Sequence, residues 1–303
     1  MNIVSKFAGP VSRSNTVNNS RWQDTTPFLL QVFSLLLILS VNSVAYGQPL
    51  SIQFSQKNQL KTGMTWIKFK PKLVLAPSHR APRKSKFDPV DPVESGDQNG
   101  RMPYSAVGKL LFTKDDGKIS SCSAAFAGSN DVIVTAAHCV MTSSGDWNEN
   151  FLFIRAYGSE NQDVYAIQCV SVPGRWGELT DANLLPFDYA FLRSTRKSTV
   201  GSLGITNGQP PGKLTIVGYS DSHYEGRHLV RLPTDVVLAE SGKIGFTGNT
   251  FGQGNSGAPW LSLSTIYSIS SHFNTSEEDI MWGPRLTDDA MSLINFTRKG
   301  CQN

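Results

Sequence analysis

The 303-residue sequence predicts an all-β body, and three observations lead to this prediction. The chain holds 26 glycines and 16 prolines, which are the residues that most often close turns. From residue 102 onward, short apolar runs alternate with turn residues such as Asp115-Asp116-Gly117, a hairpin signal. Helical spacing is found at residues 287–297, where Met291, Leu293 and Ile294 share a face. We therefore expect a β-barrel or sandwich with a short C-terminal helix.

The N-terminal 47 residues have the pattern of a secretion signal. A polar region precedes an apolar segment at residues 28–44, and Ala45-Tyr46-Gly47 has the small-x-small form that signal peptidase requires. We expect cleavage after residue 47 and a secreted, extracellular protein. The alternative is an uncleaved signal anchor, in which residues 28–44 tether the protein to a membrane.

Residues 48–101 are expected to form a basic propeptide and linker. Residues 48–86 carry nine Lys/Arg and no Asp or Glu, and residues 79–86 offer basic cleavage sites. The composition then turns acidic, so the mature chain is expected to start after Lys84, Lys86 or Arg101. Residues 102–303 hold 15 basic and 19 acidic residues, which gives no reason to expect nucleic acid as a partner. The basic propeptide is expected to be an internal partner that complements the acidic body.

The body of residues 102–303 is expected to consist of short strands. The pattern changes at Met102, and apolar runs bounded by turn residues follow one another to the C-terminal helix. The expected strands span residues 103–112, 122–126, 132–136, 151–154, 164–167, 214–219, 236–238 and 266–269.

Residues 252–259, with the sequence GQGNSGAP, read as a loop that presents Ser256. The flanking glycines allow dihedrals that other residues resist, and they let a substrate backbone come close. The amides of Gly254 and Ser256 are two residues apart and can converge on one oxyanion. A serine is a weak nucleophile without a base. His138, in the sequence TAAHC, and Asp188, among the apolar residues of PFDYAFL, are the candidate base and the carboxylate that orients it.

The three segments together resemble those of the chymotrypsin-like serine proteases, with the familiar forms T-A-A-H-C, D-x-A-x-L and G-[DN]-S-G-x-P. The order His138, Asp188, Ser256 is also the order in that family. The resemblance implies two six-stranded antiparallel β-barrels, with His138 and Asp188 from the first and Ser256 from the second. It implies a catalytic triad with Gly254 and Ser256 as the oxyanion hole, and a monomer that needs no metal and no cofactor.

The four cysteines fit an oxidising compartment. In the family that the chain resembles, the pair equivalent to Cys122 and Cys139 forms a disulfide behind the histidine. Cys169 and Cys301 then pair by elimination. The alternative is a metal site made of Cys122, His138 and Cys139, although adjacent His and Cys residues rarely ligate one ion in good geometry.

The primary specificity pocket is expected to involve Thr250, His272 and Phe273. Thr250 takes the position where trypsin-type members have a counter-charge for Lys or Arg, so a basic P1 residue is not expected. His272 resembles the pocket histidine of the glutamyl endopeptidases, the V8-like branch, and favours an acidic P1 residue. The alternative for His272 is a half-buried strand residue, with a neutral or aromatic P1 preference for the enzyme.

Several other features bear on function. The sequence GNSGA is not the G-x-S-x-G elbow of an α/β-hydrolase, and the triad order excludes that fold. A secreted binding protein that keeps the protease fold without turnover is the alternative outside enzymes. Asn255 replaces the aspartate that pairs with a new N-terminus in vertebrate members, so activation by N-terminal insertion is not expected. His223 and His228 are expected at the surface, and Asn274 and Asn295 are acceptors for glycosylation.

Overall fold

The structure, a computed structural model, describes residues 56–60, 64–68, 91–93, 97, 100–178, 184–236, 238–240, 242–274 and 280–302. The expected signal peptide, its apolar segment at residues 28–44 and the basic cleavage region at residues 79–86 lie outside the described residues. Within the ranges given above, the structure contains no helix long and apolar enough to cross a membrane.

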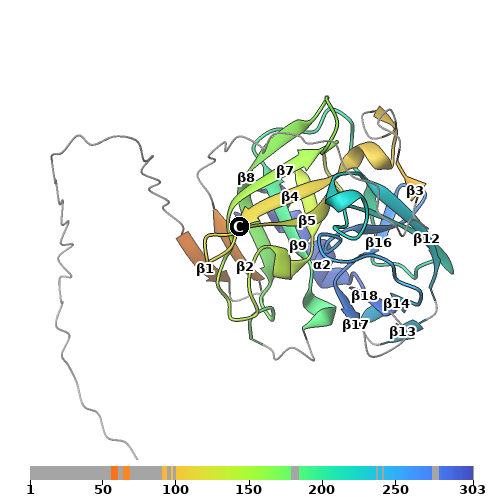
Figure 1. Cartoon of the computed structure of the whole chain (residues 1–303). Coiled ribbons are helices and arrows are strands. Elements are labelled where there is room, and N and C mark those ends of the chain that lie inside the picture. Colours follow the sequence, from red (N-terminus) through yellow and green to blue (C-terminus); the bar gives the residue numbers. More distant parts are fainter. Residues whose placement is uncertain are drawn as a thin grey trace, which may run out of the picture. The chain divides into compact units, whose positions relative to one another are not determined.

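The first half of the body is a closed six-stranded barrel, shown in yellow and green in Figure 1. Its strands pair antiparallel in the order β8-β7-β4-β5-β6-β9, and a β8–β9 pairing closes the ring. Large apolar side chains fill the interior, including Leu110, Phe126 and Phe153, all fully buried. The strands are β4 (Val107–Thr113), β5 (Ile119–Phe126), β6 (Val132–Thr135), β7 (Glu149–Arg155), β8 (Asp163–Pro173) and β9 (Ala190–Ser194).

The second half contains two sheets that share one core. One sheet has the order β10-β16-β15-β11-β12-β3, and the other has the order β13-β14-β18-β17. Ile216, Phe246 and Trp260 pack in the same apolar cluster, although they come from both sheets. The strands are β3 (Asp91–Pro92), β10 (Gly204–Ile205), β11 (Lys213–Gly218), β12 (Val230–Asp235), β13 (Leu238–Glu240), β14 (Lys243–Phe246), β15 (Pro259–Ser262), β16 (Thr265–Ile269), β17 (His272–Asn274) and β18 (Ile280–Pro284).

The C-terminal helix α2 (Asp288–Arg298) lies one residue from its predicted bounds. Leu293 and Ile294 are buried against the first barrel, as the helical spacing predicted. A disulfide between Cys169 of β8 and Cys301 holds the chain just after the helix to the barrel. The two cysteines form a small buried cluster with Phe296. The mostly β architecture with a C-terminal helix confirms the predicted fold class.

The sheets begin upstream of residue 102, where the sequence placed the start of the domain. The hairpin of β1 (Gln56–Leu60) and β2 (Met64–Lys68) adds to β8, in a register that runs from Met64 opposite Pro173 to Lys68 opposite Cys169. Thr65 and Ile67 of β2 are buried, at 6% and 4% exposure. Farther along the chain, β3 pairs with the edge of β12. Strands β8 and β12 therefore gain pairing partners from the segment that the sequence analysis interpreted as propeptide and linker. The removal of that segment remains a prediction.

This packing predicts that a chain of residues 102–303 is less stable than a chain of residues 51–303. Burial of Ile67 alone contributes about 1.5–3 kcal/mol, and the truncation also removes β2, which pairs with Cys169 to Pro173 of β8. We expect the shorter chain to unfold at a lower urea concentration, in a transition followed by circular dichroism. Ile67→Ala in the longer chain should move the midpoint in the same direction. Equal midpoints for the two chains would contradict the hairpin's role in the fold.

Candidate active site

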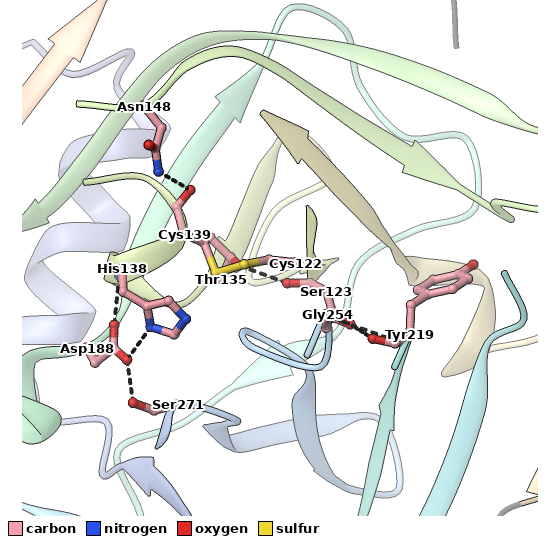
Figure 2. The surroundings of a disulfide bond; sticks show 10 residues. All are labelled: Cys122, Ser123, Thr135, His138, Cys139, Asn148, Asp188, Tyr219, Gly254 and Ser271. Carbon is pink, nitrogen blue, oxygen red and sulfur yellow. Dashed lines mark hydrogen bonds and ion pairs between the residues drawn. A yellow bond between two sulfur atoms is a disulfide. The ribbon is translucent and has the colours of Figure 1, made fainter. Parts of the chain in front are cut away.

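His138 lies three residues after the buried strand β6, in the connection to β7 of the same barrel. Ala137–Cys139 form one turn of 3-10 helix, with Ala137 and Cys139 buried on either side of the histidine. Cys139 forms a disulfide with Cys122 of β5, with a Cα–Cα distance of 6.2 Å. The disulfide beside His138, shown in Figure 2, therefore anchors the flanking residues in the core. The His138 side chain keeps 37% exposure. This arrangement presents an imidazole to solvent on a rigid support.

Asp188 holds the imidazole through two separate bonds. It follows the short 3-10 helix Leu185–Phe187 and precedes β9, and its side chain is only 5% exposed. The backbone N–H of His138 donates to Oδ1 at 2.9 Å, and Nδ1 of the ring lies 2.7 Å from Oδ2. Because a buried carboxylate accepts and does not donate, Nδ1 carries the proton. The neutral ring then has its lone pair at Nε2, free to act as a base.

Ser271 completes the surroundings of this carboxylate. Its hydroxyl donates to Oδ2 of Asp188, from the residue before β17 (Figure 2). The sequence analysis missed this role. Ser271 stands beside the singled-out His272, but a serine before a short strand carries no signal of a partner 83 residues away. Three hydrogen bonds to one buried carboxylate favour its charged form.

Asp188 and His138 shift each other's pKa, each toward the charged form of its partner. Burial by itself would raise the pKa of Asp188, but the His138 charge and the hydrogen bonds from His138 and Ser271 outweigh it and lower the pKa. Burial by itself would lower the pKa of His138, but the Asp188 charge and hydrogen bond outweigh it and hold the pKa above its ordinary value of 6.5. Asp188 therefore stays ionised and stabilises an imidazolium when one forms.

The loop that carries Ser256 packs against the strand that leads to His138. A Cβ on Gly257 would come within 2.1 Å of Thr135 Oγ1 and 2.9 Å of the Ala136 nitrogen, so only glycine fits this close approach. Gly257 also has a φ of +79°, where a side chain is unfavourable. Ser256 itself is half-buried. The fold thus brings the serine loop against the residues immediately before the histidine.

Gly254 and Ser256 provide the two backbone amides that were expected to bind the oxyanion. Gly254 has a φ of +84°, which glycine adopts without strain. Neither its amide nor that of Ser256 donates a hydrogen bond within the part of the chain that the structure describes. The side chain of Asn255, between them, is fully buried and donates through Nδ2 to Ser270 Oγ at 2.9 Å. A neutral hydrogen bond therefore anchors this residue, where vertebrate members use an ion pair.

The structure describes the three expected pocket residues to different extents. Thr250 is exposed, and its carbonyl accepts a hydrogen bond from His223 Nε2 at 2.9 Å. His272 and Phe273 form strand β17, in register with Trp282 and Met281 of β18. Their side chains lie outside the described residues, so a pocket role for them stays a prediction.

The expectation of a surface position was wrong for His223. The residue is 1% exposed, and its ring packs edge-on against Phe251 at 5.7 Å between centroids. The polar loop around it misled the sequence analysis, because the ring's hydrogen bond to Thr250 satisfies its polar atom and permits burial. His228 is half-buried, and this partial burial lowers its pKa.

The alternative metal site is not available in this structure. Ligand atoms of Cys122, His138 and Cys139 lie within 4.8 Å of one another. The two sulfurs are bonded to each other, however, and a thiolate is the form of cysteine that binds a metal.

Comparison with known proteins places this fold. No family profile and no curated protein matched the sequence. Solved structures did: a thermostable serine protease, AL20, from an extremophilic microorganism is 26% identical with a TM-score of 0.56, over 64% of this chain and 97% of its own. Protease Anisep from Arthrobacter nicotinovorans is 23% identical with a TM-score of 0.52, over 59% of this chain and 89% of its own. A Glu endopeptidase is 19% identical with a TM-score of 0.56, over 72% of this chain and all of its own.

These similarities agree with the motifs in the sequence and with the barrel and sheets observed here. The Glu endopeptidase, at its level of identity, supports the shared fold and not a branch. The chain therefore has the fold of the chymotrypsin-like serine proteases, the group that its sequence motifs resemble.

Proposed function

We propose that the protein is a secreted serine endopeptidase that acts through His138, Asp188 and Ser256. The observation that carries the proposal is the double hydrogen bond from His138 to Asp188, which places the imidazole proton on Nδ1 and leaves Nε2 as the base. A glycine-flanked serine lies on the loop that packs against this segment. General bases need a defined tautomer as well as proximity, and this carboxylate supplies it.

The proposed reaction has two halves. Oγ of Ser256 attacks the peptide carbonyl while Nε2 of His138 accepts the hydroxyl proton. The amides of Gly254 and Ser256 stabilise the oxyanion that forms. His138 then protonates the leaving amine, and an acyl-enzyme remains. Water then attacks the acyl-enzyme, with His138 again as the base, and the carboxylic acid product leaves as Ser256 is regenerated. Asp188 stays ionised throughout, in keeping with its lowered pKa.

A fluorophosphonate probe tests this proposal directly on the secreted protein in its processed form. We expect one covalent adduct per molecule, located on Ser256 by peptide mass spectrometry, and no loss of labelling in the presence of a metal chelator. The alternative, a secreted binding protein on the same fold, predicts no adduct at Ser256. Absence of labelling in folded protein with both disulfides intact would overturn the endopeptidase proposal.

The finer proposal is a preference for an acidic P1 residue, recognised by His272 with a hydroxyl from Thr250. We expect peptides with Glu at P1 to be cleaved roughly 10- to 100-fold more efficiently than peptides with Phe, the effect of one hydrogen bond to a charged group. His272→Gln should reduce this ratio, whereas His228→Gln, outside the proposed pocket, should keep it. Equal kcat/KM values for the Glu and Phe peptides in the wild type would favour the neutral or aromatic pocket instead.

Secretion and processing complete the proposal. The sequence of residues 1–47 supports signal cleavage, and two disulfides are consistent with an oxidising compartment. The alternative is a membrane-tethered form that retains residues 28–44. Substrates are proteins or peptides, and the basic segment of residues 48–101 is the proposed internal partner. N-terminal sequencing of the secreted protein distinguishes cleavage after Lys84, Lys86 or Arg101.

A further inference from the structure

We infer that Ser123 is a positioning residue that orients the oxyanion amides, an inference that rests on the proposed function. Ser123 lies in β5 of the first barrel, next to Cys122 of the disulfide that supports His138. It is fully buried, and its side chain points toward Gly254 and Tyr219, away from the His138–Asp188 pair (Figure 2).

Ser123 contacts the serine loop at two points. Its backbone N–H donates to the carbonyl of Ser256 at 2.8 Å, and its hydroxyl donates to the carbonyl of Gly254 at 3.0 Å. These two carbonyls flank the peptide unit that carries the Ser256 amide. Because peptide units are planar, fixing the unit on each side restricts the direction of the amide between them.

The same hydroxyl reaches the segment that orients the second amide. Ser123 Oγ accepts from the Tyr219 N–H at 2.8 Å and lies 3.2 Å from the Tyr219 carbonyl. Two residues farther on, the Asp221 N–H donates to the Gln253 carbonyl at 2.8 Å. That carbonyl shares a trans peptide with the Gly254 N–H, which therefore points in the opposite direction. One hydroxyl thus connects both supports of the proposed oxyanion hole.

Crowding around Ser123 makes the hydroxyl hard to replace. A Cβ on Gly218 would lie 2.9 Å from Ser123 Oγ, 2.6 Å from Ala258 Cβ and 2.7 Å from Asn255 Oδ1. Removing the hydroxyl leaves the Gly254 carbonyl and the Tyr219 N–H without this partner in a packed interior. The serine loop can then rotate slightly to recover hydrogen bonds for these groups, which turns the two amides away from the oxyanion. A misplacement of catalytic groups by about 1 Å can reduce the reaction rate roughly 100-fold.

The test measures the rate of fluorophosphonate labelling and the kcat and KM for p-nitrophenyl acetate in Ser123→Ala and in a control. Ser171→Ala is the control, since Ser171 is equally buried and its hydroxyl pairs with Thr297 of α2, so it also loses a buried hydrogen bond. We expect Ser123→Ala to reduce the labelling rate and kcat by about 10- to 100-fold with KM within threefold. Ser171→Ala should stay within threefold of the wild type.

The pH profile separates positioning from a general loss of structure. His138 and Asp188 are untouched in Ser123→Ala, so the midpoint of the labelling-rate profile should equal that of the wild type. A wild-type rate in Ser123→Ala, an equally slow Ser171→Ala, or a shifted midpoint would each overturn the inference. If Ser123→Ala is not recovered folded, Ser123→Gly takes its place, because it also removes the hydroxyl and keeps the N–H. A processed wild-type protein that does not label at all would refute the proposed function itself.

Discussion

Replacement of Ser256 by alanine is expected to reduce kcat for peptide hydrolysis by about 10⁶-fold, the loss seen when a triad nucleophile is removed. The alanine keeps the Ser256 carbonyl that accepts from the Ser123 N–H, so the loop and its glycines should retain their conformation. KM should change little, because the missing oxygen acts in the covalent step. The measurement is steady-state hydrolysis of a peptide ester together with fluorophosphonate labelling.

A matched control for this variant is Ser262→Ala. Ser262 is also half-buried and lies six residues farther along the chain, at the end of β15. It should keep wild-type turnover and labelling, which shows that the loss in Ser256→Ala comes from the nucleophile and not from the removal of any hydroxyl in this region. More than 1% residual activity in pure Ser256→Ala would show that another group attacks the substrate.

Replacement of Asp188 by asparagine is expected to reduce kcat by about 10⁴-fold. Asparagine can offer a donor where Nδ1–H needs an acceptor, so the ring is expected to turn its proton to Nε2 and lose its function as a base. The variant also removes the charge that receives bonds from the His138 N–H, the ring and Ser271. Ser271→Ala removes only one of these bonds and should cause a much smaller loss.

The same variant should shift the acid limb of the pH profile. The protonated imidazole cannot accept the serine proton, so the wild-type rate falls as pH drops through the pKa of His138, which lies above 6.5. Without the Asp188 charge and hydrogen bond that raise this pKa, burial and the Lys114 charge lower it, so the midpoint should move to lower pH. The labelling rate measured from pH 5 to 9 checks the direction. An unchanged or higher midpoint would mean that Asp188 does not control the imidazole.

Most strands of the first barrel could be predicted from the sequence, since they are short apolar runs between turn residues. The hairpin of residues 56–68 could not, although Lys68 and Ile67 belong to an alternating run that is itself a strand signal. The absence of acidic residues in that region favoured the interpretation as a propeptide. Its pairing with β8 depends on an edge more than 100 residues away, which no local pattern reveals.

The candidate site also contains residues that the sequence predicted and residues that it did not. His138, Asp188 and Ser256 could be selected because each lies in a recognisable context. Ser123, Ser271 and the buried His223 could not, since each acts through a partner far away in the sequence: Gly254, Asp188 and Thr250. A serine or a histidine in a polar stretch has the same local sequence whether its side chain faces water or a distant carbonyl.

The sequence by itself determined the β class of the body, the C-terminal helix and the three residues proposed for catalysis, because periodicity and short motifs are local properties of the chain. Only the tertiary structure decided which hydroxyls and carbonyls meet around those residues. Hydrogen bonds form between atoms about 3 Å apart in space. The closure of the first barrel brings His138 to Asp188, and the packing of the two halves of the body brings Ser123 to Gly254 and Ser271 to Asp188.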